Sequence, residues 1–400
     1  MTTMTLLSNR MVYLLAFASA VVTANAYYIH PIISRVATSL DVSTALVGIV
    51  PALNQIALAL GVLLLLPLGD RVNNRSLVAV CLSIQVIMLG IMATVNDFWT
   101  FTAASTVLGF FTITPYLVPA YASKHVEPRR LGFVTAVLTS GVIAGVQLSR
   151  LTSGVLAETI SWHAVYWLAA GMMSISAVAL PMLMTENARS ASSMQRLPYP
   201  VLLMSQFKLL AAVPNVFISG IIQGCNFGIF LVIWMGISLH LTSDAMGYGT
   251  DLVGYLTAFS AVGLLTTAGL GKWADRLGAE RARMIMASIQ FGGIALYSLA
   301  GTHWQWLVLP LLITSIVGPM IDVTGRMTGL KHQAENRSRL MSVYVALMFV
   351  GGGAGSWSGT ASYAAFGWTG IVTLALTLSL VVMGLSYRQY RRANIIGPIS

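Results

Sequence analysis

Charged residues are scarce in this sequence. Asp, Glu, Lys and Arg together make up 8% of its 400 residues, whereas hydrophobic residues make up 56%. Soluble domains contain roughly 25% charged residues, and a soluble fold of this length could not bury so much apolar surface. Lipid must therefore surround most of the chain. This excludes a soluble enzyme or binding module and indicates an all-α membrane protein.

Several kinds of site are also missing. Cys81 and Cys225 are the only cysteines and both lie in apolar runs, so no disulfide framework is expected. No Cys/His cluster has metal-ligand spacing, and no Walker loop is present to bind ATP. No span or loop contains a paired acid, base or nucleophile. We therefore expect no enzymatic activity, no metal and no cofactor.

The net charge of +10 does not indicate nucleic acid binding, because the basic residues occupy short turns between apolar stretches and not one soluble face. Their distribution instead predicts the topology. With the N-terminus in the cytoplasm, nineteen of the 22 Lys and Arg residues are cytoplasmic and only Arg35 lies outside, as the positive-inside rule favours. Both termini are then cytoplasmic, and in a bacterium the chain lies in the inner membrane.

Twelve apolar stretches are each close to the roughly 20 residues that a helix needs to cross a bilayer. We place them at 11–33, 44–67, 77–95, 98–122, 131–157, 162–184, 214–240, 249–271, 283–300, 304–328, 339–365 and 367–387. Between the sixth and seventh spans, residues 185–213 form a linker, in which Tyr199 to Val213 predicts a helix lying at the membrane interface. We expect an N-terminal six-helix bundle over 1–184 and a C-terminal one over 214–400.

The two halves of the chain repeat each other at an offset close to 205 residues. The turn that contains Asp70 and Arg71 after span 2 returns as Asp275 and Arg276 after span 8. Pro115 maps onto Pro319, Ser153-Gly154 onto Ser358-Gly359, and Trp162 near Trp368. Four matches at one offset indicate a duplicated unit, and a duplicated helical membrane protein has the layout of a secondary transporter.

These residues resemble the major facilitator superfamily. The Asp-Arg turns are similar to its Gly-x-x-x-Asp-Arg signature, and the duplication of six spans covers the whole chain. The stretches Ala26–Pro31, Gly61–Asp70 and Gly351–Ser356 resemble its drug/proton antiporter branch, of the predicted arabinose-efflux permease type. The resemblance implies export of small molecules. The chain departs from the branch at two positions, where Ser105 replaces an Arg in span 4 and Arg150 replaces a Pro in span 5.

The Asp-Arg turns predict a cytoplasmic gate. A carboxylate at the membrane surface can accept hydrogen bonds from the N-terminus of a neighbouring helix, whose dipole favours negative charge. Such contacts would latch helices together and break when the halves rock apart. The alternative is a solvated turn whose basic residues only set topology. The gate residues are Asp70, Arg71, Arg75, Asp275, Arg276 and Arg281.

Once the loops are assigned, only three charged residues remain within spans. Each costs at least roughly 2.5 kcal/mol near the bilayer centre. Asp322 and Arg326 are four residues apart on span 10, so they share a helix face and can pair. Asp322 is the only embedded carboxylate and hence the candidate proton carrier; the alternative is a permanent ion pair that lets Arg326 reach the interface. Arg150, in the outer half of span 5, would hold an anionic substrate group or a polar partner at the interface between the halves.

Polar residues in otherwise apolar spans predict the substrate cavity. In the superfamily, spans 1, 4, 7 and 10 line the central path, which is where most of these residues fall. Aromatic rings beside amides suit an amphipathic or planar solute, although a single buried amide is more often a hydrogen bond between helices. The candidates are Asn25, Tyr28, Asn54, Gln55, Tyr116, Gln147, Arg150, Gln223, Asn226 and Trp234.

Three functions remain open. The first is a proton-coupled exporter of a small amphipathic molecule by alternating access, working as a monomer in lipid. The second is an uptake symporter or an uncoupled facilitator for a small nutrient. The third is a non-transporting membrane receptor, which should carry a large soluble domain or a long tail that this sequence lacks.

Overall fold

The computed structural model describes residues 7–123, 125–184, 198–301, 303–330 and 334–396, and these residues form helices joined by short turns. Apolar runs free of charge favour helices in lipid, because a helix satisfies its own backbone hydrogen bonds. The helices of the first half are α1 (Asn9–Ala24), α2 (Ile29–Ser39), α3 (Thr44–Val47), α4 (Ile49–Leu65), η1 (Pro67–Asp70), α5 (Asn74–Thr94), α6 (Phe98–Phe111), α7 (Thr114–Ser123), η2 (Pro128–Arg130), α8 (Leu131–Thr159) and α9 (Trp162–Leu183).

The second half follows after the connecting helix α10 (Tyr199–Ala212). Its helices are α11 (Pro214–Leu241), α12 (Thr250–Ser260), α13 (Val262–Leu277), α14 (Ala279–Ala295), η4 (Leu296–Ala300), η5 (Trp304–Leu307), α15 (Val308–Leu330) and α16 (Ala334–Ile396). Within α16, Gly367 has a φ of 59°, which reverses the chain and divides this stretch into two crossings.

The helices account for the predicted spans. Nine stretches in the described ranges are long and apolar enough to cross a membrane, and one of them, Arg339–Asn394, consists of two helices that meet at Gly367 and is long enough for two crossings. The pairs α12–α13 and α14–η4 occupy the predicted spans 8 and 9. Spans 1 and 4 are each broken in the middle, at the turn 25–28 and at 112–113.

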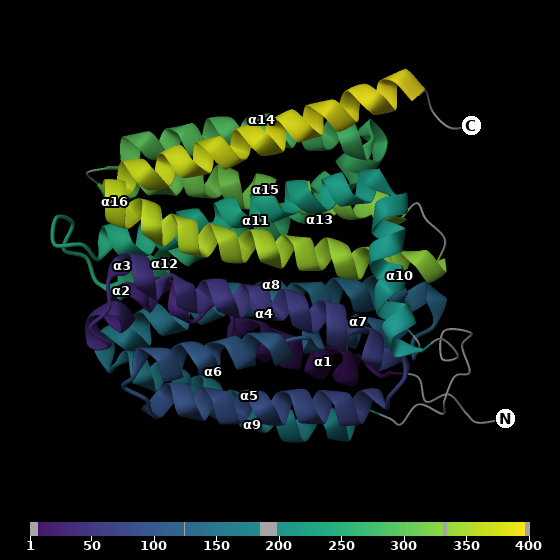
Figure 1. Cartoon of the computed structure of the whole chain (residues 1–400), viewed down its shortest axis with the longest axis horizontal. Helices are drawn as coiled ribbons and strands as arrows, with labels where there is room; N and C mark the ends of the chain where they lie inside the picture. The colour runs from purple at the N-terminus through teal and green to yellow at the C-terminus, as the bar shows by residue number, and fades with distance from the viewer. Residues whose placement is uncertain (1–6, 124, 185–197, 302, 331–333, 397–400) are drawn as a thin grey trace.

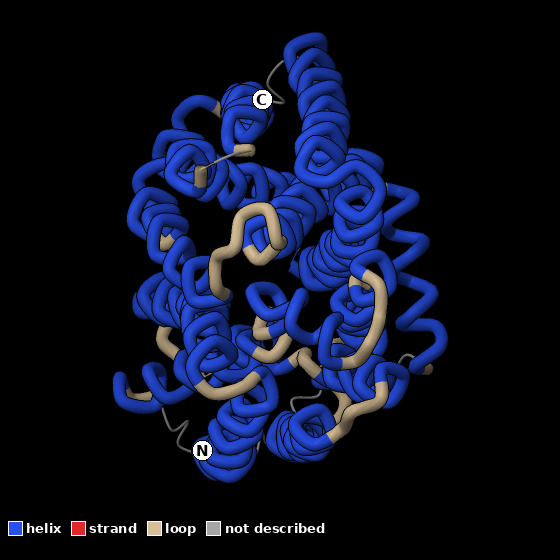
Figure 2. The backbone as a smooth tube through the Cα atoms, turned by 90° about the vertical axis from the view of Figure 1, so that its left-hand side faces the viewer, coloured by secondary structure: helices blue, strands red, loops and turns tan. Residues whose placement is uncertain are grey.

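The helices lie side by side along the long axis of the molecule (Figure 1). One hydrophobic core forms mainly among helices of the first half and a second core among helices of the second half. Helix α1 starts and α16 ends at the same end of the bundle, which we name the terminal face. Figure 2 views the opposite end, the distal face, where short loops join the helices.

Helix α10 crosses the terminal face from one half toward the other (Figure 1). Tyr199 donates its hydroxyl hydrogen bond to the Leu64 carbonyl, and Gln206 Nε2 lies 3.5 Å from the Leu63 carbonyl. These carbonyls belong to the last turn of α4, where Pro67 has no N–H to offer Leu63. The linker helix α10 thus supplies hydrogen-bond donors to backbone carbonyls at the end of span 2. The rest of the linker, 185–197, lies outside the described residues, and the domain boundaries stay a prediction.

Candidate functional site

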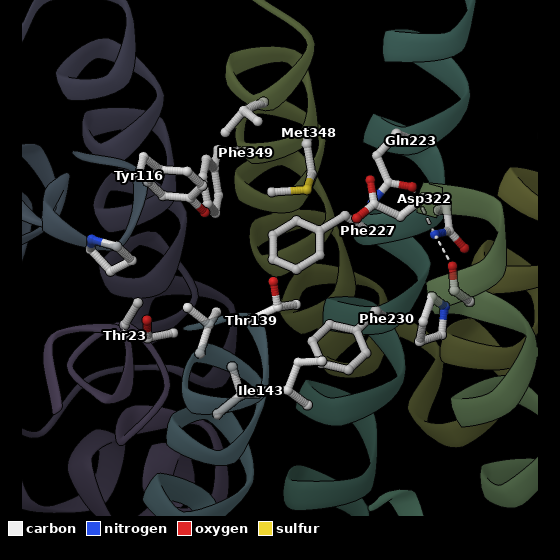
Figure 3. Close-up of a pocket in the computed structure, with 18 of the residues that line it drawn as sticks. Thr23, Tyr116, Thr139, Ile143, Gln223, Phe227, Phe230, Asp322, Met348 and Phe349 are labelled. Atoms are coloured by element: carbon white, nitrogen blue, oxygen red, sulfur yellow. Dashed lines mark hydrogen bonds between the residues drawn. The ribbon is translucent and has the colours of Figure 1, made fainter. Parts of the chain in front are cut away.

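A cavity of about 760 Å³ lies between the two halves. Its walls come from the breaks in spans 1 and 4, from α8 of the first half, and from α11, α15 and α16 of the second (Figure 3). It extends to Gly69 and Met341, which lie toward the terminal face. The cavity therefore sits where a transported molecule would be held, between two units that repeat each other.

The wall on the side of the first half is mainly aromatic and aliphatic. Tyr27, Tyr116 and Pro115 line it together with side chains of α8 such as Val142. The Tyr116 ring meets Phe349 of the second half edge-on, with 5.9 Å between ring centroids (Figure 3). This wall can pack against the flat or apolar part of a solute.

The wall on the side of the second half carries a network of amides. Gln290 Nε2 donates to Asn226 Oδ1 at 2.7 Å, and Asn226 Nδ2 donates to Gln223 Oε1 at 3.0 Å and to the Gly318 carbonyl at 3.1 Å. All three amide residues line the cavity, and Gln290 Oε1 has no hydrogen-bond partner among the described residues. The network thus places three linked amides at this wall and leaves one buried oxygen without a donor from the described residues.

Beside these amides, Asp322 and Arg326 form the predicted pair on α15. Arg326 Nε donates to both carboxylate oxygens at 3.0 Å, and both residues line the cavity. Tyr344 of span 11 also donates to Asp322 Oδ1 at 2.9 Å. Of the described residues that line the cavity, Asp322 alone carries a carboxyl group. The carboxylate faces the cavity while two donors hold it, so an added proton would have to compete with both.

Arg150 lies behind the distal end of the cavity wall and is fully buried. Its guanidinium carbon is 4.2 Å from the ring centroid of Trp234 and 4.6 Å from that of Phe230, both on α11 and both facing the cavity. One guanidinium nitrogen lies 3.0 Å from His30 Nδ1, while Nε and Nη1 have no hydrogen-bond partner within the described ranges. Aromatic faces of the other half therefore replace a carboxylate as the partner of this cation.

The two halves close against each other at the distal face. Ser238 donates to the Pro31 carbonyl at 2.9 Å, and Gln147, which also lines the cavity, donates to Ser260 Oγ at 2.6 Å. Gly154 packs against α12 so closely that a Cβ there would lie 2.5 Å from the Thr250 carbonyl oxygen. These contacts join spans 1 and 5 to spans 7 and 8.

Besides Arg150, four predicted cavity residues do not line the cavity. Asn25 Nδ2 donates to Gln85 Oε1 at 3.3 Å inside the first half, and Asn54 Nδ2 donates to the Ser105 carbonyl at 2.7 Å, between α4 and α6. Tyr28 is buried in the span 1 turn, where its neighbour Tyr27 faces the cavity instead, and the buried Gln55 lies away from it as well. Helical periodicity alone does not say which buried face meets a cavity.

The predicted gate residues lie at the terminal face. Arg71 is placed over the Tyr199 ring of α10 at 5.8 Å, whereas the side chain of Asp70 lies outside the described residues. The other members have exposed side chains: Arg75, Asp275, Arg276 and Arg281.

Sequence reasoning missed several polar residues that the structure brings together. Gln85 and Gln290 differ by 205 positions, the offset of the Asp-Arg turns, so the internal repeat held a signal for them. Arg283 is one of the nineteen Lys and Arg residues predicted to be cytoplasmic, but it is fully buried in α14, where it donates to Ser219 Oγ at 3.0 Å and to Gln389. The helix begins before Arg283, which places this cation inside the bundle.

Comparison with known proteins agrees with this architecture. The family model of the Major Facilitator Superfamily matches residues 15–321 and 213–396. The chain is 24% identical over 395 residues to the putative uncharacterized transporter YgaY of Escherichia coli K12, covering 96% of this chain and 97% of that protein.

It is 21% identical over 307 residues to the multidrug resistance protein MdtG of Serratia proteamaculans, covering 76% of this chain and 74% of that protein. Among solved structures, the nucleoside transporter NupG is similar with a TM-score of 0.75 at 15% identity, covering 95% of this chain and 98% of that one. At this identity the likeness shows the fold.

Proposed function

Because the chain belongs to the Major Facilitator Superfamily, whose members are transporters and not enzymes, we propose that it exports a small amphipathic molecule in exchange for protons. The observation that carries the proposal is the Asp322 carboxyl group, which faces the cavity within reach of Arg326 and Tyr344. The multidrug resistance name of the relative MdtG supports export. Substrate and proton would then use one cavity in turn.

Topology follows from the charges. The terminal face carries most of the basic residues, so we place it in the cytoplasm and the distal face outside, in a bacterial inner membrane. In this structure the halves meet at the distal face and the cavity extends toward the terminal face, which suits entry of a substrate from the cytoplasm. The protein would work as a monomer, because each chain encloses its own cavity.

The cycle has a simple physical basis. An apolar solute packs on the wall formed by Tyr116 and Tyr27, while its polar groups meet Gln223 and Gln290 on the other wall. When a proton binds Asp322, the ion pair with Arg326 is lost and Arg326 is free for other contacts. Moving one charge across 100 mV supplies ~2.3 kcal/mol. Because tenfold accumulation costs ~1.4 kcal/mol, one proton per cycle sustains a gradient of roughly fifty-fold.

Asp322→Asn tests this proposal in proteoliposomes. We expect uphill transport driven by a pH gradient to be abolished, while exchange of substrate across the membrane persists, because the amide keeps the shape but cannot carry a proton. Tyr344→Phe is the matched control, since it removes one hydrogen bond to Asp322 Oδ1 and leaves the carboxyl group in place. Uphill transport with normal pH dependence in Asp322→Asn would make the ion pair structural. Accumulation of the substrate on the side of the terminal face would instead favour an uptake symporter.

The terminal gate is proposed to depend on the Asp-Arg turns. Asp275→Asn should slow transport several-fold without reducing expression, because its exposed side chain contributes little to packing. Initial rates compared with those of Arg388→Gln, a change at an exposed basic residue outside the Asp-Arg turns, would check this. Equal rates in the wild type and in Asp275→Asn would leave the turn with a role in topology only.

A further inference from the structure

Glu158 occupies the last turn of α8 at the distal face, in contact with the other half. One carboxylate oxygen, Oε1, lies 2.5 Å from Arg35 Nη2 of α2. The other, Oε2, accepts from the Thr250 backbone N–H at 2.8 Å and from the Thr250 hydroxyl at 3.1 Å. A single carboxylate of the first half therefore binds both a cation of its own half and the first residue of α12 in the second half.

The start of α12 is built to receive this carboxylate. The first N–H groups of a helix have no partner within the helix, and the helix dipole makes this end positive. The N-cap position of α12 is Gly249, which has no side chain to accept a hydrogen bond, so Glu158 supplies the cap from the other half. A Cβ on Gly249 would lie 2.8 Å from the Glu158 carboxyl group, so glycine also leaves the space for its approach.

The cation and the donors around Glu158 stabilise its ionised form while the distal face is closed. On α2 it faces Arg35, and on α12 it faces Asp251, whose Oδ1 lies 2.5 Å from the same absent Cβ of Gly249. Glu158 also lines a surface hollow together with Trp162 of α9 and Tyr248 of the loop that precedes α12. Arg35 thus favours the ionised form of Glu158, whereas the nearby carboxylate of Asp251 favours the protonated form. The Glu158 side chain is 31% exposed, so it can exchange a proton with water.

We propose that Glu158 is a proton-binding site on the distal face, and that its deprotonated form holds this face closed. The inference rests on the alternating-access transport proposed above and not on the role of Asp322. A proton taken from distal water converts the carboxylate into a neutral acid, with no bond other than the new O–H formed. The hydrogen bonds from Thr250 then lose their charge-assisted character, which roughly halves their strength, and the ion-pair attraction to Arg35 is lost.

Protonation of Glu158 therefore has a defined effect on the distal face. Acid on the distal side weakens the contact between α8 and α12 and favours the conformation that is open to that side. In an exporter this is the state that releases substrate, so an acidic exterior would favour release. An exposed ion pair contributes little by itself, so most of the effect comes from the cap on α12. We expect a shift of about fivefold in the closed-to-open ratio, at the low end of typical coupling between sites.

The experiment measures the distance across the distal face in the full chain in lipid nanodiscs. Spin labels at Ser39 and Ala245, both exposed and in opposite halves, report opening by pulsed electron resonance, after Cys81 and Cys225 are replaced by Ala. In the otherwise wild-type chain, acidification should raise the long-distance population about fivefold, the size of coupling given above.

Glu158→Gln should show the long distance already at neutral pH and should not respond to acid. Arg35→Gln should open the face in part but keep the response, because the carboxylate remains; it also serves if Glu158→Gln fails to fold. Asp244→Asn, a change at an exposed distal carboxylate, should behave as the wild type. A normal pH response in Glu158→Gln would overturn the proposal.

A chain that carries Asp322→Asn separates the two proposals. The distal face should still open on acidification there, even if uphill transport is lost. Loss of the distal response in Asp322→Asn would move the pH sensitivity to the cavity and would overturn the role of Glu158.

Discussion

The two halves contain the same pair of amides and use them differently. In the first half, Asn25 donates to Gln85, whose own amide donates to the Phe111 carbonyl at 2.9 Å, and neither residue lines the cavity. In the second half, the corresponding bond runs in the opposite direction, from Gln290 to Asn226, and both residues line the cavity. Duplication therefore preserved a hydrogen bond between three spans, while the surroundings decided whether it also meets a solute.

The embedded charges differ between the halves as well. Arg150 of the first half lies toward the distal face among aromatic rings of the second half. Arg283 of the second half lies toward the terminal face among hydroxyl and amide groups. Asp322 has no counterpart in the first half, since the offset that maps Pro115 onto Pro319 places Val118 there. Polar chemistry is thus concentrated in one half, and the other half supplies the apolar wall.

The largest effect should come from close packing, which both halves share. A Cβ on Gly351 would lie 2.2 Å from the Gly224 carbonyl oxygen, and one on Gly145 would lie 2.3 Å from that of Ala20. Gly351→Val should therefore abolish folded protein, because the backbone of α11 cannot yield, as monodisperse yield after purification would show. Gly90→Val is the control, since nothing lies within 4 Å of its Cβ position. Normal yield of Gly351→Val would mean that α11 and α16 can separate.

The second prediction compares the amide pair Asn226–Gln290 with the pair Asn25–Gln85. Gln290→Leu should weaken substrate binding about tenfold, equivalent to ~1.4 kcal/mol, because it removes an amide that lines the cavity and holds Asn226 in place. Thermal unfolding and binding measured on one preparation check this. Gln85→Leu should leave substrate binding unchanged and destabilise the fold by about 0.6 to 1.7 kcal/mol, the range for hydrogen bonds between membrane helices. Weaker substrate binding in Gln85→Leu together with unchanged binding in Gln290→Leu would contradict the assignment of substrate binding to the second half.

The smallest effect concerns a helix start outside the membrane. Asp97 caps α6 by accepting from the Thr100 N–H at 2.7 Å, and this bond lowers the pKa of its exposed carboxyl group. At the corresponding place in the second half, His303 precedes η5 and makes no side-chain cap. A pKa that is lower in the folded state gives stability above the unfolded pKa, which is lost as the pH falls through the folded one.

Asp97→Ala should therefore reduce thermal stability slightly at neutral pH and remove a small part of its decline in acid. His303→Ala is the matched change in the second half and should have no such pH-dependent effect. Equal melting behaviour of the wild type and Asp97→Ala at all pH values would show that the cap contributes nothing.

The sequence by itself determined the membrane class, the helical spans and the duplication. Apolar runs must become helices in lipid, and the repeat of Asp70 and Asp275 does not depend on how the spans pack. It also identified Asp322 and Arg326 as partners, because i and i+4 residues share a helix face.

Only the tertiary structure decided which polar residues meet the cavity. Asn25 and Asn226 look alike in the sequence, but the turn of each span and its neighbours set whether an amide faces another helix or the space between the halves. The same holds for Glu158. In the sequence it is one acidic residue near the end of a span, and only the structure shows that it accepts a hydrogen bond from α12 of the other half. Contacts between segments about 90 residues apart depend on how whole helices pack, which local sequence patterns do not encode.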